Sequence, residues 1–321
     1  MILGLETSCD ETAAAIVAWH GEILANVVAS QADLHARFGG VVPEIAARRH
    51  LELVSPVVRQ ALDDAGASLD EVELVAVTQG PGLIGALLVG LSAAKALAWG
   101  CGVPLAPVDH LRGHVASLFL EPDPLEPPFL CLLATGGHTL LLDVLDHSTH
   151  VVLGRTIDDA AGEAFDKGAR VLGLGYPGGP EIDRAAAKGD EHAFSFPVAR
   201  LAGLDFSFSG VKTSLLYAVR DLAPEELERR RADLAASYQR AIVEALVGRV
   251  ALATEQTGRE RVAVVGGVAA NSALRRALPG AVSAPLALCT DNAAMIASAA
   301  RWVERLEPPA CLELDAYASV A

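Results

Sequence analysis

Hydrophobic and polar positions repeat one layout in the two halves of the chain. Each half begins with three short apolar runs, which predict a meander of three β-strands. The runs span residues 1–6, 13–18 and 23–28 in the first half and 130–135, 139–144 and 150–154 in the second. Helices and strands are predicted to alternate after each trio. We therefore expect an α/β fold of two similar halves, with a site in the cleft between them.

A proline-rich segment at residues 121–128, with four prolines in eight residues, predicts the boundary between the halves. We expect domains at residues 1–122 and 128–321, the second with an inserted helical region at about 175–230. The elements expected after the first trio are a helix at 44–65, a strand at 74–78, a helix at 83–99, a strand at 105–108 and a helix from 111. Those expected after the second trio are helices at 158–172 and 232–257, a strand at 262–265, and helices at 271–277 and 293–304.

Composition and charge narrow the class of protein. Hydrophobic residues make up 52% of the 321 positions, which is typical of a globular chain with a large core. The 25 Lys and Arg against 40 Asp and Glu give a formal charge of −15, which argues against a broad nucleic-acid-binding surface. The five cysteines lie apart, without a Cys-x-x-Cys pair, which predicts reduced thiols and a cytoplasmic location.

Membrane association is not expected. The chain does not begin with a basic and then apolar leader, so we do not expect secretion. The most apolar stretch, residues 83–99, is interrupted by glycines and carries Ser92 and Lys95. Because a bilayer span needs about 20 apolar residues, this stretch is predicted to be a buried helix.

Two histidines at positions 110 and 114 suggest a metal site. On a helix, residues at i and i+4 share a face, so both imidazoles can reach one ion. A zinc protease of the His-Glu-x-x-His type needs a glutamate after the first histidine, and this chain has Leu111 there. The pair therefore resembles a metal site without the hydrolytic base, and the alternative is a helix with two histidines on its polar face.

Asp291 is the third candidate ligand. It lies between a short apolar segment and a predicted helix, at the position of an N-cap, and a plain cap is the alternative interpretation. With His110 and His114 it completes a set of two histidines and one carboxylate. That set suits iron(II) and also admits zinc or manganese.

Glycine-rich turns follow several predicted strands. They lie at residues 80–85, 135–138, 177–180 and 266–271. Glycine lets backbone N–H groups approach a phosphate closely, and helix N-termini favour anions, so four such turns indicate a nucleotide-type ligand. None matches the P-loop or the Rossmann fingerprint, and glycine also simply permits tight turns.

Carboxylates near two strand ends are further candidates. Asp10 and Glu11 follow the first strand and are candidate proton acceptors, although an ordinary polar turn is the alternative. Asp166 lies two turns into a predicted helix, where a cap role is excluded, and a ribose hydroxyl is one partner for it. Asp183, just past Gly179, is a weaker candidate of the same kind.

Ten motifs, taken in order, resemble the bacterial TsaD family of tRNA threonylcarbamoyladenosine transferases, formerly described as O-sialoglycoprotein endopeptidases. The matching stretches are GLETSCDET (4–12), FGGVVPE (38–44), GPGLIG (80–85), HLRGH (110–114), TGGHT (135–139), IDDAAGEAFDK (157–167), YPGGP (176–180), LDFSFSG (204–210), GGVAAN (266–271) and CTDN (289–292). They cover almost the whole chain.

The resemblance implies a duplicated actin/Hsp70/sugar-kinase-like fold and one reaction. A threonylcarbamoyl group would pass from threonylcarbamoyl-AMP to the exocyclic amine of the adenosine 3′ of the anticodon, in tRNAs that read codons beginning with A, and AMP would leave. It implies that one divalent metal, iron(II) or alternatively zinc, is held by His110, His114 and Asp291. It implies that the adenylate is held by the following residues: Leu133, Ala134, Thr135, Gly136, Gly137, Asp166, Gly179, Asp183 and Asn271. It also implies two partners, a TsaB-like paralogue and a TsaE-like ATPase.

Three other classes of protein fit less well. A metalloprotease explains the histidine pair but not the missing glutamate or the glycine turns. A sugar kinase or chaperone-like ATPase fits the turns but has no need of a two-histidine metal site. A non-catalytic member of the same complex is expected to have lost the metal ligands, and this chain keeps all three.

Overall fold

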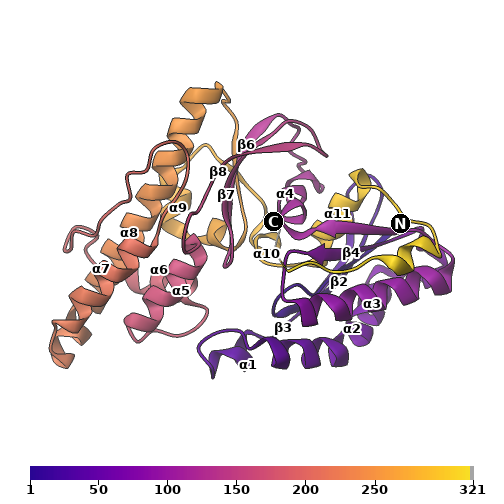
Figure 1. The fold of residues 1–321 in the computed structure, drawn as a ribbon, viewed down its shortest axis with the longest axis horizontal. Coiled ribbons are helices and arrows are strands. Elements are labelled where there is room, and N and C mark those ends of the chain that lie inside the picture. The colour runs from indigo at the N-terminus through magenta and orange to yellow at the C-terminus, as the bar shows by residue number, and fades with distance from the viewer. Residues whose placement is uncertain (319–321) are drawn as a thin grey trace. The chain divides into compact units, whose positions relative to one another are not determined.

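The computed structural model describes residues 1–318, and the chain forms two compact units (Figure 1). Unit 1 contains residues 1–126 and the final segment from Thr290, and unit 2 is Pro127–Cys289. The predicted second domain, residues 128–321, is therefore wrong in its C-terminal part. The reason is that the last helix packs on the sheet of unit 1, against its first three strands.

The sheet of unit 1 has five strands in the order β3-β2-β1-β4-β5. Their bounds are β1 Ile2–Glu6, β2 Glu11–Val17, β3 Ile23–Ser30, β4 Leu74–Gly80 and β5 Leu105–Asp109. The first three strands form the predicted antiparallel meander, and β4 and β5 run parallel to β1. The carboxyl ends of β1, β4 and β5 therefore meet at one edge of the sheet.

The helices of unit 1 are α1 Ala32–Ala36, α2 Pro43–Ala65, α3 Ile84–Cys101, α4 His110–Ala116 and α11 Ala293–Ala299. Alternation along β1 assigns a face of the sheet to them. Leu3 and Leu5 join the core formed with α2 and α3, whereas Gly4 faces α11. A Cβ on Gly4 would lie 2.4 Å from the carbonyl oxygen of Ala293, so this glycine lets α11 pack directly on the strand.

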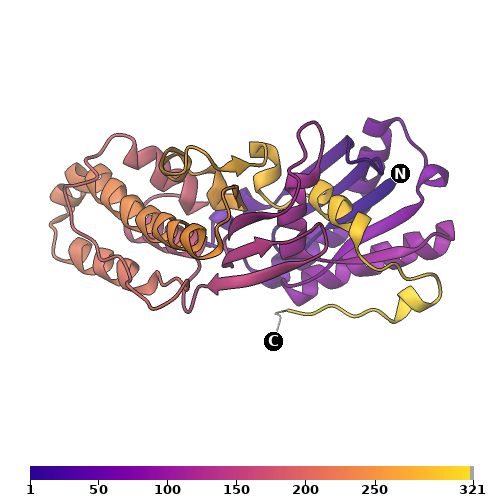
Figure 2. The ribbon, with the colours of Figure 1, turned by 90° about the horizontal axis from the view of Figure 1, so that it is seen from above.

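One helix among residues 1–318, α3, is long and apolar enough to cross a membrane by length and composition alone. It carries Leu91, Ala94 and Ala98 in the core of unit 1, and it packs against α2 and β4. The C-terminal segment runs along it in Figure 2. Lys95 of the helix donates a hydrogen bond to the carbonyl of Leu314. The predicted buried helix is therefore buried on one face only, since Ile84, Leu88 and Trp99 are exposed.

Unit 2 repeats the topology of unit 1. Its strands are β6 Phe129–Ala134, β7 Thr139–Val144, β8 His150–Arg155, β9 Val262–Val265 and β10 Val282–Ser283, in the order β10-β9-β6-β7-β8. The first three are antiparallel neighbours, and β9 and β10 continue the sheet in parallel. The expected pair of similar α/β halves is thus confirmed, while a site in a cleft between them stays a prediction.

The helices of unit 2 are α5 Ala161–Val171, α6 Gly178–Ala186, α7 Ser209–Arg220, α8 Pro224–Thr257, α9 Ser272–Ala277 and α10 Leu286–Cys289. The fully buried Tyr238 of α8 donates a hydrogen bond to the Ala164 carbonyl and packs where a Cβ of Gly168 would lie. The helix α8 begins eight residues earlier than predicted, because Pro224 and two glutamates suit a first turn.

Candidate metal site and glycine-turn cluster

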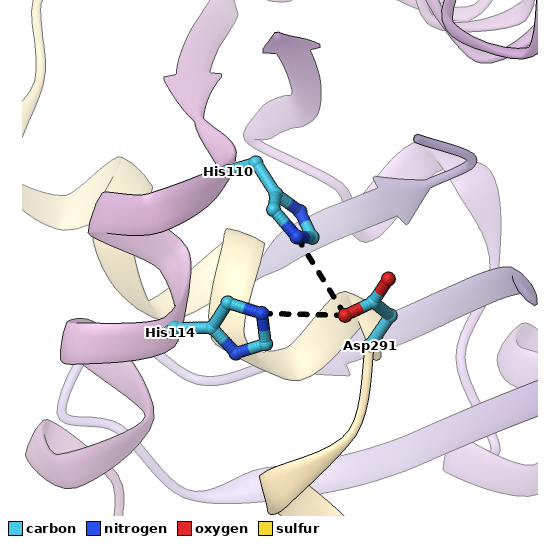
Figure 3. Close-up of side chains that lie close together, drawn as sticks. All are labelled: His110, His114 and Asp291. Atoms are coloured by element: carbon cyan, nitrogen blue, oxygen red, sulfur yellow. Dashed lines mark ion pairs between the residues drawn. The ribbon is translucent and has the colours of Figure 1, made fainter. Parts of the chain in front are cut away.

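The three predicted metal ligands lie together in unit 1 (Figure 3). The Nε2 atom of His114 lies 3.2 Å from Oδ1 of Asp291, and that of His110 lies 3.6 Å from the same oxygen. The two imidazole rings are nearly perpendicular, with centroids 4.7 Å apart. One ligand atom from each residue lies within 4.8 Å of the others.

Local structure explains why the two histidines face Asp291. Strand β5 ends at Asp109, whose carboxylate accepts hydrogen bonds from the N–H groups of Leu111 and Arg112 and so caps α4. The helix begins at His110, and its first turn brings His114 onto the same face.

Asp291 is not the cap of the last helix. That role belongs to Asn292, whose side chain accepts a hydrogen bond from the N–H of Met295. The predicted cap position of Asp291 is therefore wrong by one residue. Because Asn292 caps α11, the carboxylate of Asp291 is directed to the histidines, as Figure 3 shows.

The residues fit a divalent metal. Both ring nitrogens of His114 are buried without a hydrogen-bond partner among residues 1–318, although Nε2 is within ion-pair distance of Asp291. A buried unpaired imidazole is costly, and a metal bond would satisfy it. Two ligands of a tetrahedral ion with bonds of about 2.0–2.1 Å lie about 3.3 Å apart, close to the observed nitrogen–oxygen separations.

The charges around His110 also favour a cation. Burial by itself lowers the pKa of this imidazole, but the carboxylates of Asp291 and Glu6 raise it to about 9. At neutral pH the site thus attracts either a proton or a metal ion to His110.

Sequence reasoning missed Glu6. This residue is fully buried and lies 3.0 Å, through Oε2, from Nδ1 of His110. It ends an otherwise apolar run, and a charged residue in that position was the only signal in the sequence. Its partner 104 residues away could not be identified without the topology that joins the ends of β1 and β5.

The predicted proton acceptors lie beside the metal ligands. Asp10 is nearly buried, and Glu11 is the first residue of β2. Burial, then the charges of Asp291 and Asp10, raise the pKa of Glu11 far above its usual range. Glu11 also accepts a hydrogen bond from Ser30. Glu11 therefore retains a proton more readily than an isolated glutamate does.

The turn of residues 135–138 in unit 2 joins β6 to β7. The hydroxyl of Thr135 accepts hydrogen bonds from the N–H groups of Gly137 and His138, so the turn uses these two donors itself. Gly136 and Gly137 are exposed, and no described heavy atom lies within 4 Å of a Cβ built on either. Leu133 and Ala134 are fully buried in β6, and their contact with a ligand stays a prediction.

Two other glycine-containing segments pack closely against this turn. A Cβ on Gly162, at the start of α5, would lie 2.5 Å from the carbonyl oxygen of Thr135. A Cβ on Gly266 would lie 2.5 Å from the carbonyl oxygen of Ala134, and its φ of +88° also favours glycine. The structure therefore brings three glycine-containing segments of unit 2 together.

Asp166 has a capping contact that the sequence did not predict. Its Oδ1 accepts a hydrogen bond of 2.7 Å from the N–H of Gly178, the first residue of α6. A cap role within its own helix is excluded as expected, but the carboxylate serves the next helix. Gly179 follows, with open space where a Cβ would lie.

Asp183 of α6 and Asn271, which precedes α9, lie in another part of unit 2. Asp183 accepts hydrogen bonds from the N–H and hydroxyl of Ser272. Asn271 caps α9 through Leu274 and donates to Gln239. A cavity of about 210 Å³ opens beside them. Its lining residues are Asp183, Ala186, Ala187, Gly189, Glu191, Ala236, Gln239, Ser272 and Arg276.

Comparison with known proteins identifies the family. A profile of the family described as "TsaD: tRNA N6-adenosine threonylcarbamoyltransferase" matches residues 22–298. A tRNA N6-adenosine threonylcarbamoyltransferase of Symbiobacterium thermophilum is 53% identical over 98% of this chain and 95% of its own length. The chain belongs to this family. A TsaD relative of Salinibacter ruber is 55% identical over 93% of each chain. The predicted resemblance is confirmed, and the family is one of transferases.

Solved structures of low sequence identity support the fold alone. HypF of T. kodakarensis matches 93% of this chain and 46% of its own, with a TM-score of 0.60 and 15% identity. Component A of the Acidaminococcus fermentans (R)-2-hydroxyglutaryl-CoA dehydratase matches 94% and 96%, with a TM-score of 0.53 and 15% identity. They confirm the predicted actin-like α/β class.

Proposed function

We propose that this TsaD family member transfers a threonylcarbamoyl group from threonylcarbamoyl-AMP to the N6 amine of the adenosine 3′ of the anticodon, in tRNAs that read codons beginning with A. The observation that carries the proposal is the convergence of His110, His114 and Asp291 in a chain of this family. The same geometry argues against a metalloprotease of the His-Glu-x-x-His type, because Leu111 stands where such an enzyme has its base.

The chemistry is a substitution at the carbamoyl carbon. The N6 nitrogen forms a bond to this carbon, the bond from the carbon to the phosphate oxygen breaks, and AMP leaves. A metal held by His110, His114 and Asp291 supplies Lewis-acid activation when bound. Iron(II) is proposed as the ion, with zinc as the alternative, because both suit this donor set.

The carboxylates beside the ligands take part in proton movement. The attacking amine loses a proton, and Asp10 and Glu11 are the proposed acceptors. The raised pKa of Glu11 favours its protonated form at neutral pH, and this supports Asp10 as the first of the two proposed acceptors.

The turn cluster of unit 2 is proposed to hold the adenylate. Exposed Gly136 and Gly137, and open space at Gly179, allow a ligand to approach the backbone closely. Asp183 lines the cavity, and Asn271 donates a hydrogen bond to the lining residue Gln239, so both place polar groups suited to a ribose or a base at or next to it. Asp166 contributes by fixing the start of α6.

Partners are proposed from the family and from the surface of unit 1. The side chains of Leu51 on α2, and of Ile84 and Leu88 on α3, are 66%, 40% and 42% exposed. Apolar exposure on two packed helices suits a paralogous TsaB-like subunit. A TsaE-like ATPase and the tRNA complete the proposed assembly, in the cytoplasm. The charge of −15 makes a helper surface for tRNA useful.

Reconstituted transfer tests the proposal. The purified chain, with and without TsaB-like and TsaE-like partners, is incubated with threonylcarbamoyl-AMP and unmodified tRNA, and the digested nucleosides are weighed by mass spectrometry. We expect threonylcarbamoyladenosine from the wild type and from His20→Ala, a matched control whose side chain is 65% exposed. His114→Ala should form little product. Equal product from His114→Ala with equal metal content would refute the metal-assisted route.

A further inference from the structure

Glu6 is a charged side chain in the interior of unit 1. It ends β1 and is 0% exposed, between the sheet and the elements that carry the metal ligands. Because side chains alternate along a strand, Glu6 shares the face of Gly4, which packs on α11, and not that of Leu5. A buried carboxylate is retained only where partners compensate its desolvation.

Both oxygens of Glu6 have defined partners. Oε1 accepts a hydrogen bond of 2.5 Å from the N–H of Ser8. Oε2 accepts one of 2.6 Å from the hydroxyl of Thr78, at the end of the neighbouring parallel strand β4. The same Oε2 lies 3.0 Å from Nδ1 of His110. The first two contacts fix the carboxylate, and the third connects it to the histidine.

The geometry points to Glu6 as the residue that positions His110 for metal binding, an inference that rests on the metal site proposed above. We propose that the Nδ1–H of His110 donates to Oε2 of Glu6, which leaves Nε2 unprotonated and directed to the ion. In many metal sites a carboxylate holds the second nitrogen of a histidine ligand in this way, fixing its tautomer and its orientation.

The two histidines differ in this respect. Nδ1 of His110 is near both Glu6 and, at 3.3 Å, the hydroxyl of Ser8. Nδ1 of His114 has no hydrogen-bond partner within residues 1–318. The orientation of His114 therefore depends on the packing of α4 and on Asp291, whereas that of His110 is also set by the hydrogen bonds at the end of β1.

Glu6→Gln tests the inference with little change of shape. If Oε1 of the glutamine still accepts from Ser8, its amide nitrogen faces His110 and donates to Nδ1. The proton of the imidazole then moves to Nε2, the nitrogen that the metal needs. We expect the dissociation constant for zinc, measured by competition with a chromophoric chelator, to rise about 10- to 100-fold.

The tautomer provides a readout that simple destabilisation would not change. In ¹⁵N-histidine-labelled, zinc-loaded protein, long-range ¹H–¹⁵N spectra should show His110 protonated at Nδ1, with the signal assigned by its loss in His110→Ala. In Glu6→Gln, His110 should no longer bind the zinc, and its proton should be found on Nε2. The matched control is Thr78→Val, which removes another partner of the carboxylate but keeps its contact with His110. It should raise the zinc dissociation constant by less than about tenfold.

Three results would contradict the inference. Wild-type zinc affinity and an Nδ1–H tautomer in Glu6→Gln would show that Glu6 does not position His110. Equal loss of zinc in Glu6→Gln and Thr78→Val would assign the effect to collapse of the strand ends. Unchanged zinc binding in His110→Ala would remove the metal site itself, which separates failure of the proposed function from failure of the role of Glu6.

Discussion

The two units share a sheet topology but place different chemistry at the same point of it. In unit 1 the loop after the first strand carries carboxylates and hydroxyls, from Glu6 to Glu11, beside the metal ligands. In unit 2 the corresponding loop is the turn of residues 135–138, with exposed glycines and no carboxylate. The shared fold thus fixes a position at the end of the first strand, and the local sequence decides what that position can bind.

The last parallel strand of each sheet shows a second difference. In unit 1, β5 leads directly into α4, which is capped by Asp109 and carries both histidines. In unit 2, β10 has two residues and is followed by the four-residue helix α10. Unit 1 therefore has a seven-residue helix at this edge that carries two candidate ligands, whereas the short helix α10 of unit 2 carries neither a histidine nor a carboxylate.

The largest expected effect separates chemistry in unit 1 from binding in unit 2. His114→Ala should lower kcat for threonylcarbamoyl transfer by more than about a hundredfold, because it removes a metal ligand and with it Lewis-acid activation. Asp183→Ala should mainly raise the KM for threonylcarbamoyl-AMP. The expected rise is about tenfold, because the substitution removes one charge-assisted hydrogen bond to the substrate. Steady-state kinetics with saturating tRNA measures both.

The matched control for this pair is Asp190→Ala, at an exposed position outside the cavity lining. A kcat loss in Asp183→Ala as large as that in His114→Ala would contradict the division of roles between the units.

A second prediction concerns a device that both units use. In each unit, a glycine in the turn after the fourth strand packs closely against the backbone at the end of the first strand. A Cβ on Gly82 would lie 2.6 Å from the Ser8 carbonyl oxygen, and one on Gly266 would lie 2.5 Å from the Ala134 carbonyl oxygen. Only Gly266 also has a positive φ. Gly266→Ala should therefore cost about 2–4 kcal/mol of unfolding free energy, and Gly82→Ala about 1–3 kcal/mol.

Urea unfolding followed by circular dichroism measures both changes. Gly136→Ala, which has open space at its Cβ, serves as the control and should be nearly neutral. A larger cost for Gly82→Ala than for Gly266→Ala would show that the positive φ contributes little.

A third prediction concerns α4, which has no equivalent in unit 2. The hydroxyl of Tyr317 donates a hydrogen bond of 2.8 Å to Oδ2 of Asp109, the residue that caps this helix. Tyr317→Phe should lower the unfolding free energy by about 0.5–1.5 kcal/mol. Thermal unfolding measures it, with Tyr217→Phe, on an exposed residue of α7, as the control. An unchanged unfolding free energy in Tyr317→Phe would show that Asp109 caps α4 without the hydrogen bond from Tyr317.

The smallest effect is a pH dependence in unit 2. Burial raises the pKa of Asp159, but ion pairs with Lys167 and Lys212 outweigh it and hold the pKa below its usual value. A carboxyl whose folded pKa is lowered contributes stability above its unfolded pKa of about 3.9, and that stability is lost as the pH falls through the folded value. Asp159→Asn should therefore cost up to about 1 kcal/mol at pH 7.

The difference between wild type and Asp159→Asn should shrink as the pH is lowered from 5 to 2. Urea unfolding at several pH values gives this difference directly. A difference that stays constant across the range would exclude the ion pairs as its source.

Much of the fold could be predicted because the periodicity of hydrophobic positions and the residues typical of turns are local signals in the sequence. Strands β7 and β9 were predicted at their observed bounds, and the seven other predicted strands lie within two residues of theirs at each end. The five-residue helix α1 and the short helix α10 were not predicted, because their patterns are too brief to distinguish from loops. The domain boundary was wrong because the apolar pattern of α11 does not say which sheet the helix covers.

The candidate site was predictable where spacing carries the information. His110 and His114 share a face because they are four residues apart, and Asp291 was found from its place before a helix. Glu6 was missed, because its role depends on neighbours in β4 and β5 that only the strand order defines. The cap of α6 by Asp166 was missed for the same reason.

Asp291 returns to unit 1 from beyond the whole of unit 2. During synthesis the ribosome therefore produces both histidines long before the carboxylate, and a nascent chain holds an incomplete ligand set while unit 2 emerges. A product truncated before residue 290 would have the α4 pair but neither the third ligand nor the helix α11 that covers the strands of unit 1. The predicted ligand set is thus complete only after the whole of unit 2, Pro127–Cys289, has been synthesised.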